Sequence, residues 1–185
     1  TKDYKGWTKP ALPWALFAGG IFSLGIMMGA AWAYESLTFG GYWAWDPVEN
    51  ASLVPWLTLV AGIHTAMIYN KTGASLKATY LFLGISFLLI VYSTFLTRSG
   101  ILGDTSVHAF TDLGMNGQLL FFLFIFVIPF FVLYFVRYKH MQEPVKDDAI
   151  DSREFWMLIG SLVLVLSAAV IIIKTSTPVF NKIFD

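Results

Sequence analysis

The chain has 185 residues, of which 57% are hydrophobic and 13% are charged, and its mean hydropathy is +0.67. A soluble domain of this size needs more charge to cover its surface, and a net charge of zero creates no overall field to attract nucleic acid. The absence of cysteine excludes disulfides, a thiolate nucleophile and a cysteine-ligated metal.

Five apolar runs predict five membrane-spanning helices, because about 20 helical residues cross about 30 Å of hydrocarbon. We expect these helices near residues 14–34, 47–69, 78–97, 117–136 and 155–173. No run alternates as a membrane β-strand would. The sequence therefore predicts an all-α, polytopic membrane protein with a single membrane domain over residues 1–185. The chain begins with Thr1 and carries no signal-peptide cleavage motif, so we expect it to be the middle of a longer protein.

The distribution of lysine and arginine predicts the orientation of the helices. Nine of the twelve basic residues lie in the N-terminal stretch and in the loops 70–77 and 137–153, and three lie on the opposite side. The side with nine should be cytoplasmic. The loops 35–50 and 98–116 should then both face outward.

The second helix carries clear signals for its start. Asp46 can cap it, Pro47 suits the first helical position, and Glu49 follows three residues after the cap as in a capping box. Both carboxylates would oppose the positive end of the helix dipole. Pro55, inside the same helix, should kink it or free a backbone carbonyl.

The outward loop before this helix is rich in glycine and aromatic residues and has no lysine or arginine. Flat apolar rings suit a flat apolar ligand such as haem, and glycine permits close approach of the backbone. The alternative is an interfacial belt of tryptophan and tyrosine, and capping alone would explain the two carboxylates. The residues that we assign to a ligand site here are Gly40, Gly41, Tyr42, Trp43, Trp45, Asp46 and Trp56.

His64 lies 17 residues beyond Pro47, roughly 25 Å along the helix, on the face that also carries Trp56 and Val60. An ionisable group inside a membrane usually faces a partner or a cofactor, and neutral imidazole is a standard axial ligand of haem iron. A histidine hydrogen-bonded between two helices is an equal alternative.

His108 lies in the second outward loop with Val107 and Phe110, and Arg98 precedes this loop. In isolation His108 would be read as a solvated loop residue. Arg98 is suited to pairing with carboxylates such as haem propionates, or it could anchor the helix at the interface. His140 lies between Lys139 and Met141 in a cytoplasmic loop, and we expect no role for it.

Three segments together resemble a known family. Residues 40–52 read GGYWAWDPVENAS, residues 97–101 read TRSGI with SVHAF at 106–110, and Ser152-Arg153-Glu154 precedes an apolar helix. In this order they are similar to the hallmarks of the cytochrome c maturation protein F family, including its tryptophan-rich WWD segment. This family forms the membrane core of the bacterial cytochrome c haem lyase.

The resemblance implies two haem sites. His64 matches the transmembrane histidine that binds the iron of a resident b-type haem, and His108 matches an outer-face histidine that binds the iron of the incoming, transient haem. Residues 40–50 match the platform on which a haem chaperone delivers that haem. The thiols of a Cys-x-x-Cys-His apocytochrome c then add across the haem vinyl groups to form thioethers. The members of the family are therefore expected to be enzymes.

The resemblance also implies a location and partners. The protein would be a multi-pass component of the bacterial inner membrane, in contact with lipid, with the aromatic loop and the His108 loop facing the periplasm. Other cytochrome c maturation subunits would be further partners, and no nucleic acid is expected. No residue is assigned as a catalytic acid or base.

Two departures from the family pattern matter. Family members commonly have tryptophan at the positions of Phe39 and Tyr42, although both replacements are aromatic. The family also uses two histidines for each haem, and the second ligands are expected upstream and downstream of this chain. A haem transporter without bond-forming activity is the alternative function, and a structural membrane subunit with interfacial aromatics is a third.

Overall fold

The computed structural model describes residues 6–37, 41–103, 105–106, 114–141, 143–144 and 150–184. Over these residues the chain contains helices and no β-strand. The helices are α1 (Thr8–Ser36), α2 (Pro47–Thr72), α3 (Leu76–Arg98), α4 (Asn116–Arg137), the short η1 (Tyr138–His140), α5 (Arg153–Thr175) and α6 (Thr177–Phe184). The described helices α1 to α5 have the length and composition to cross a membrane, so the predicted all-α polytopic fold is confirmed.

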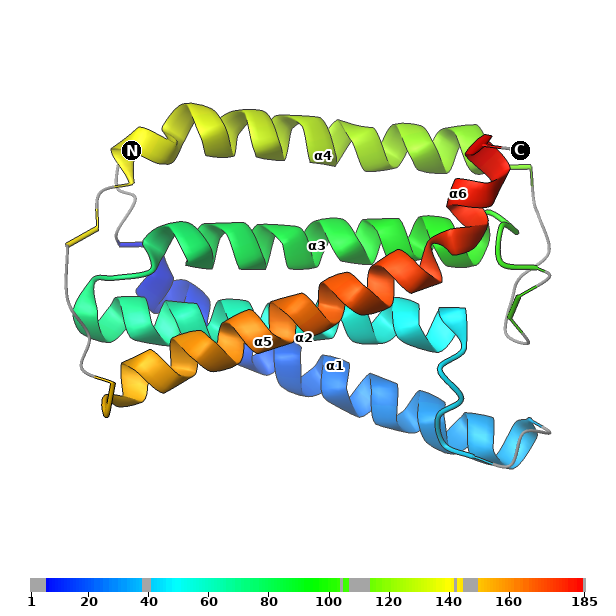
Figure 1. Ribbon diagram of the computed structural model, residues 1–185, viewed down its shortest axis with the longest axis horizontal. Coiled ribbons are helices and arrows are strands. Elements are labelled where there is room, and N and C mark those ends of the chain that lie inside the picture. Colours follow the sequence, from blue (N-terminus) through cyan, green and yellow to red (C-terminus); the bar gives the residue numbers. More distant parts are fainter. Residues whose placement is uncertain are drawn as a thin grey trace.

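The five long helices run alternately in opposite directions, with α2 at the centre (Figure 1). Helix α2 packs against α1, α3 and α5, whereas α4 packs against α3 at one edge. Helix α5 crosses α2 obliquely, and α1 diverges from α2 toward its own C-terminal end (Figure 1). We call the end of the bundle where α2 begins the Asp46 end and the end where α2 stops the Lys71 end.

The start of α2 follows from its local sequence. Asp46 is the N-cap, and its side chain accepts a hydrogen bond from the backbone N–H of Val48 at 2.9 Å. Pro47 occupies the first helical position, where a missing N–H costs nothing. Glu49 completes the capping box by accepting a hydrogen bond from the N–H of Asp46 at 3.3 Å. The predicted capping residues are therefore confirmed.

Pro55 lies inside α2 and has no N–H to donate to the carbonyl of Ala51, one turn earlier. Ser93 of α3 donates its hydroxyl to that carbonyl at 2.5 Å. Ser86, also on α3, donates to the carbonyl of Pro55 at 2.9 Å. The carbonyl that proline frees, as the sequence predicts, is thus used to join α2 to α3.

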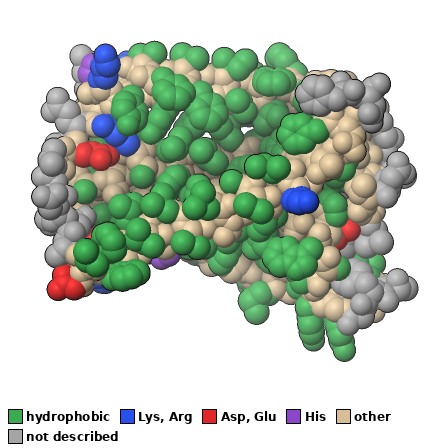
Figure 2. All heavy atoms as spheres, viewed as in Figure 1, with side chains coloured by type: hydrophobic (Ala, Val, Ile, Leu, Met, Phe, Trp, Pro, Cys, Tyr) green, Lys and Arg blue, Asp and Glu red, His purple; other side chains and the backbone are tan. Residues whose placement is uncertain are grey.

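The outside of the bundle is apolar. No described residue of α4 is buried, and its exposed side chains include Phe121, Ile128 and Phe135. In the view of Figure 2, hydrophobic side chains cover the middle of the molecule and charged side chains lie toward its two ends. This is the surface expected of a helical bundle that is surrounded by hydrocarbon.

The sequence does not predict α6, because its eight residues are too few to cross a membrane. Tyr92 of α3 donates its hydroxyl to Ser176, between α5 and α6, at 2.7 Å. Val179 of α6 packs against the buried cluster that contains Phe95 and Leu102. These contacts fold α6 back over the Asp46 end of α3.

Candidate functional site

Glu49 shapes the aromatic loop that precedes α2. Its Oε2 accepts hydrogen bonds from the backbone N–H groups of Ala44 at 2.9 Å and Asp46 at 3.3 Å. Asn50 donates its side-chain amide to the carbonyl of Trp45 at 2.9 Å. These three bonds hold the backbone of residues 44–46 against the first turn of α2.

Trp45 has a left-handed backbone conformation, with a φ of 55°. Such a conformation is uncommon for a bulky residue and costs about 1–3 kcal/mol, which the hydrogen bonds on either side of Trp45 offset. The outcome is an indole that is 64% exposed at the Asp46 end. The loop therefore presents this ring outward instead of packing it into the bundle.

The neighbouring rings of the loop are also arranged against one another. Trp43 meets Trp45 edge to face, with ring centroids 6.2 Å apart and planes at 86°. Tyr42 stacks on Tyr34 of α1, with centroids 4.4 Å apart and planes at 9°, and both tyrosines are exposed. Gly41 is half-buried in the same loop, whereas Gly40 lies outside the described residues.

A cavity of about 240 Å³ lies where α1 diverges from α2. Trp43 and Glu49 line it on the side of the loop and α2, and Gly25 and Gly29 line it on α1. A Cβ built on either glycine would have no heavy atom within 4 Å. The contact between α1 and α2 is therefore open directly beside the aromatic loop.

A hydrogen bond joins the aromatic loop to the loop that follows α3. Ser106 donates its hydroxyl to Oδ1 of Asp46 at 2.6 Å, the same oxygen that caps α2. Arg98 is exposed in the last turn of α3, at the same end of the bundle. His108 lies outside the described residues, so its role as a haem ligand stays a prediction.

His64 lies on α2, roughly 27 Å along the helix axis from Asp46. Its side chain is half-buried, and its Nδ1 is buried with no hydrogen-bond partner among the described residues. A buried polar nitrogen is unfavourable until something satisfies it, and neutral imidazole binds haem iron readily. His64 therefore fits the part of one axial ligand. His140, on η1, is exposed.

Trp56 connects α2 to α1 on the way from the loop to His64. Its indole N–H lies 2.7 Å from the hydroxyl of Ser23 and 3.3 Å from the carbonyl of Gly19. A Cβ at Gly19 would lie 3.2 Å from Ile63, so glycine lets the two helices approach closely. Trp56 thus has a helix-packing role, and a role in holding a ligand stays a prediction.

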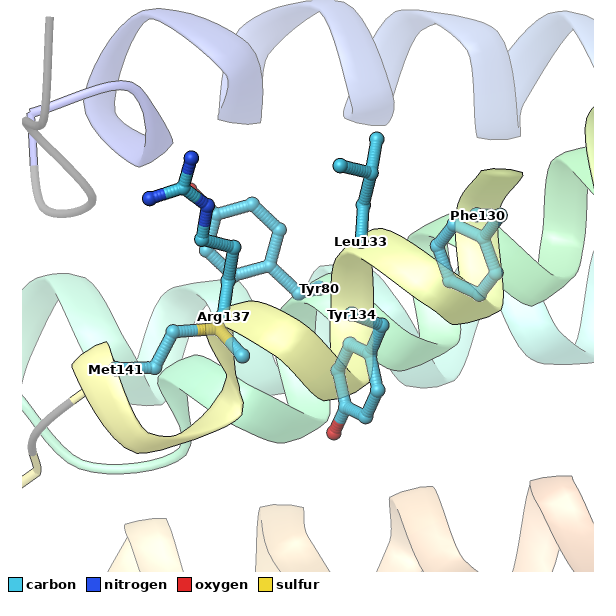
Figure 3. Close-up of a pocket in the computed structure, with 6 residues that line it drawn as sticks. All are labelled: Tyr80, Phe130, Leu133, Tyr134, Arg137 and Met141. Carbon is cyan, nitrogen blue, oxygen red and sulfur yellow. The ribbon is translucent and has the colours of Figure 1, made fainter. Parts of the chain in front are cut away.

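A second cavity, of about 190 Å³, lies at the Lys71 end between α3 and α4 (Figure 3). Tyr80 of α3 forms one wall, and the others are Phe130, Leu133, Tyr134 and Arg137 of α4, with Met141 beyond it. None of the predicted ligand-site residues lines this cavity. The predicted residues at the Asp46 end and His64 in the membrane remain the two candidate regions.

Sequence reasoning gave no role to three residues that shape this site. Ser106 binds Asp46, Asn50 holds the carbonyl of Trp45, and Tyr34 supports the ring of Tyr42. Ser106 and Asn50 are both part of the motifs that carry the family resemblance, which was the available signal. For Tyr34 the sequence offered no signal beyond its position near the end of an apolar run.

Residues 1–102 match the family model described as Cytochrome C assembly protein. The chain belongs to the cytochrome c assembly protein family. Among curated members, it is 40% identical to the cytochrome c-type biogenesis protein CcmF of Escherichia coli (strain K12), over 92% of this chain and 26% of the relative. It is 38% identical to the cytochrome c-type biogenesis protein CycK of Rhizobium meliloti (strain 1021), over 93% of this chain and 25% of the relative.

A solved structure leads to the same family. The chain superposes on the structure titled Cytochrome c Heme Lyase CcmF with a TM-score of 0.74 and 32% sequence identity, over 97% of this chain and 26% of that one. The resemblance read from the motifs is therefore confirmed. The chain spans about a quarter of the length of the CcmF proteins that it matches.

Proposed function

We propose that this chain is the part of a cytochrome c haem lyase that receives haem on the aromatic loop and presents it to the thiols of an apocytochrome c. One observation carries the proposal: the hydrogen bond from Ser106 to Asp46. It ties the loop of exposed aromatic rings to the loop in which His108 follows two residues after Ser106. A porphyrin site needs both an aromatic surface and an axial ligand.

The incoming haem is the substrate of this site. The exposed rings of Tyr42 and Trp45 would stack on the porphyrin, and His108 would bind its iron. Arg98 would pair with a propionate, for which a guanidinium is well suited. Gly40 and Gly41 would let the backbone approach the ring. Asp46 acts through its hydrogen bonds, because it holds the two loops together.

His64 would hold a resident b-type haem in the membrane through one axial bond from its imidazole. The second ligand would come from outside the described residues. When bound, this haem supplies one-electron chemistry that keeps the incoming iron reduced. Trp56 and Ser23 fix α1 beside the helix that carries His64.

The chemistry of the site is positioning, because no paired acid and base meet at the Asp46 end among the described residues. The distribution of basic residues supports an orientation in which the Asp46 end would face the periplasmic side of the bacterial inner membrane. The haem chaperone, the apocytochrome and other maturation subunits would meet the protein there. A haem transporter without bond-forming activity remains the competing function.

Purified full-length protein would test the proposal by its visible spectrum and by thioether formation on a Cys-x-x-Cys-His peptide supplied with haem. The lyase function predicts a haem Soret band and thioether product. Haem binding without product would establish the transporter instead. Full-length protein without a haem spectrum would exclude both the lyase and the transporter and would favour a structural membrane subunit.

Two histidine variants would then separate the two haem sites. His108→Ala should abolish binding of the incoming haem and retain the membrane haem, and His64→Ala should remove the b-type spectrum. Unchanged affinity for incoming haem in His108→Ala would refute that ligand, and an intact b-type spectrum in His64→Ala would refute the other.

A further inference from the structure

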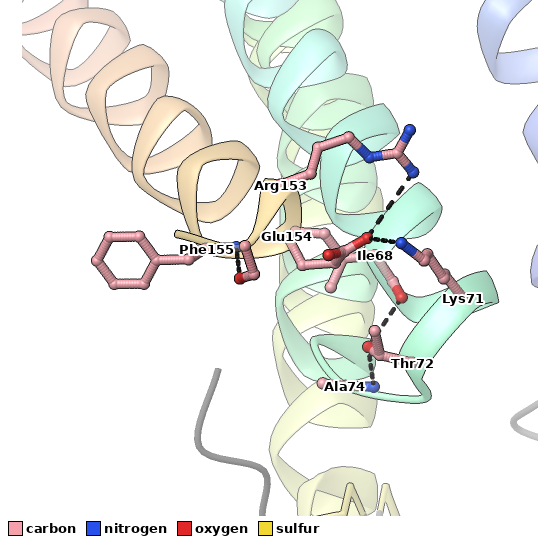
Figure 4. Close-up of polar contacts among 8 residues, drawn as sticks. Ile68, Lys71, Thr72, Ala74, Arg153, Glu154 and Phe155 are labelled. Carbon is pink, nitrogen blue, oxygen red and sulfur yellow. Dashed lines mark hydrogen bonds and ion pairs between the residues drawn. The ribbon is translucent and has the colours of Figure 1, made fainter. Parts of the chain in front are cut away.

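The Ser152-Arg153-Glu154 segment connects the start of α5 to the last turn of α2. Ser152 is the N-cap of α5, and its hydroxyl accepts a hydrogen bond from the N–H of Phe155 at 3.1 Å. Glu154 is buried, and its Oε1 accepts a hydrogen bond from Nζ of Lys71 at 2.5 Å. Arg153 approaches the same oxygen at 3.8 Å, so two cations converge on one carboxylate (Figure 4).

A second contact between α2 and α5 lies further along both helices. Leu57 of α2 and Ala168 of α5 belong to one buried cluster. Leu57 is 14 residues before Lys71, and Ala168 is 14 residues after Glu154. The equal spacing suits a single antiparallel register of the two helices through both contacts. Such a register would place residue 64 of α2 opposite residue 161 of α5, halfway between the two contacts.

His64 lies on the side of α2 that faces α5. Leu57, His64 and Lys71 are spaced by seven residues, and each such step turns a helix by only about 20°. Ser161, on the opposing turn of α5, is fully buried, and it donates its hydroxyl to the carbonyl of Met157 within its own helix. This side of α5 thus faces the turn of α2 that carries His64.

The Tyr92–Ser176 hydrogen bond and the cluster of Leu57 and Ala168 hold α5 toward the Asp46 end, whereas the ion pair is its polar contact with α2 at the Lys71 end. The side chains of α5 at the halfway point and at the far contact are small, Ser161 and Ala168, and two apolar helices in hydrocarbon gain little from the hydrophobic effect. The Glu154 carboxylate is buried whereas Lys71 is largely exposed, and a buried carboxylate that needs a cation favours the one register that brings Lys71 to it. A slip of one residue would move α5 by about 1.5 Å along α2.

We propose that the Glu154–Lys71 ion pair is a positioning contact for His64, which sets the register of α5 on α2 and thereby the geometry of the haem pocket around the imidazole. This inference rests on the proposed function, in which His64 binds a resident haem. The pair lies two turns from His64 and touches no haem. It acts only through the placement of α5, and displacements of about 1 Å are enough to disturb a bound group.

The test uses full-length, haem-loaded protein and compares Glu154→Gln and Lys71→Met with Lys71→Arg. The measurements are the rate of haem transfer to an apomyoglobin scavenger, the visible spectrum and the midpoint potential, each on the folded fraction isolated by size exclusion. We expect Glu154→Gln and Lys71→Met to lose haem about tenfold faster, the low end for groups that orient a metal ligand, with a shifted potential. Lys71→Arg, which restores a cation, should behave as the unmodified protein.

Two further variants keep the test decisive. Combining Lys71→Met with Glu154→Gln should be no worse than either alone, because both break one contact. Lys139→Met removes a lysine from the same end of the bundle, on η1, and should change nothing. Unchanged haem loss and potential in folded Glu154→Gln, while His64→Ala loses its haem, would overturn the positioning role alone. Retention of haem by His64→Ala would overturn the ligand assignment on which it rests.

Discussion

Helices α2 and α4 are both long enough to cross a membrane, yet they occupy opposite environments. Helix α4 is the most apolar of the five candidate spans and has no buried residue among those described, whereas α2 is the least apolar and the most buried. In a soluble protein the order would be reversed. Hydrocarbon solvates apolar side chains as well as a protein interior does, so hydrophobicity does not decide which helix is central.

Small and polar residues instead decide which helix lies at the centre of the bundle. The buried face of α2 contains Gly62, Thr58 and Thr65, and the carbonyls of Ala51 and Pro55 accept hydrogen bonds from α3. Such groups permit close packing and need partners within the protein. The helix that is best held is therefore also the one that carries an ionisable residue, His64, within its membrane span.

The largest difference between the two helices should appear on adding one methyl group. In α2, a Cβ at Gly62 would lie 2.6 Å from the side chain of Leu83, whereas at Gly117 of α4 it would have no heavy atom within 4 Å. We expect Gly62→Ala to lower the free energy of unfolding by about 1–3 kcal/mol and Gly117→Ala to leave it unchanged or slightly raised. Thermal unfolding of the full-length protein in detergent measures both, and equal effects would contradict the packing described here.

The second-largest difference should come from the N-terminal caps of α2 and α4. Asp46 caps α2 and also binds Ser106, whereas Met115 at the start of α4 makes no side-chain cap. Asp46→Ala should therefore cost about 1–2 kcal/mol, and Met115→Ala about zero. Ser106→Ala should show a smaller loss than Asp46→Ala, since the cap survives in it. The same unfolding measurement checks this order, and a larger loss for Ser106→Ala would contradict it.

A smaller effect is expected from the hydroxyl that satisfies the carbonyl freed by Pro55. Ser93→Ala would leave the carbonyl of Ala51 unpaired and should cost about 0.6–1 kcal/mol, the usual value for a hydrogen bond between membrane helices. The hydroxyl of Thr94 donates to the carbonyl of Ile90 in its own helix. Thr94→Ala is thus the matched control, and a loss there as large as in Ser93→Ala would show that the bond between helices has no special role.

The smallest effect should come from the exposed face of α4. Phe121 is 71% exposed, so Phe121→Leu should change the free energy of unfolding of this region by less than about 0.5 kcal/mol. A loss above 1 kcal/mol in the full-length protein would mean that another part of the protein packs on α4.

Much of the fold could be predicted from the sequence because length and apolar composition are enough to identify membrane-spanning helices. The start of α2 could be predicted too, since Asp46, Pro47 and Glu49 cap the helix within one turn. The position of α2 at the centre was not, because it depends on contacts between distant residues, such as Ser93 with Ala51. The bond between Ser106 and Asp46 spans 60 residues, and no local pattern predicts it.

In the candidate site, too, some features could be predicted from the local sequence and others depend on the folded structure. Aromatic clustering singled out Tyr42, Trp43 and Trp45, but the left-handed backbone that exposes Trp45 was not foreseeable from residue types. Trp56 looked like part of a ligand surface because it shares a face with His64. That assignment stays a prediction, and the N–H of Trp56 also reaches Ser23 across the helix interface, a contact that depends on how α1 crosses α2.

The most direct test of the account replaces His64 with Gly in the full-length protein and records the visible spectrum with and without added imidazole. If α2 holds an axial ligand of a membrane haem, the variant loses the b-type spectrum, and free imidazole entering the vacated space restores it. A variant whose spectrum matches that of the unmodified protein before imidazole is added would contradict the assignment of His64.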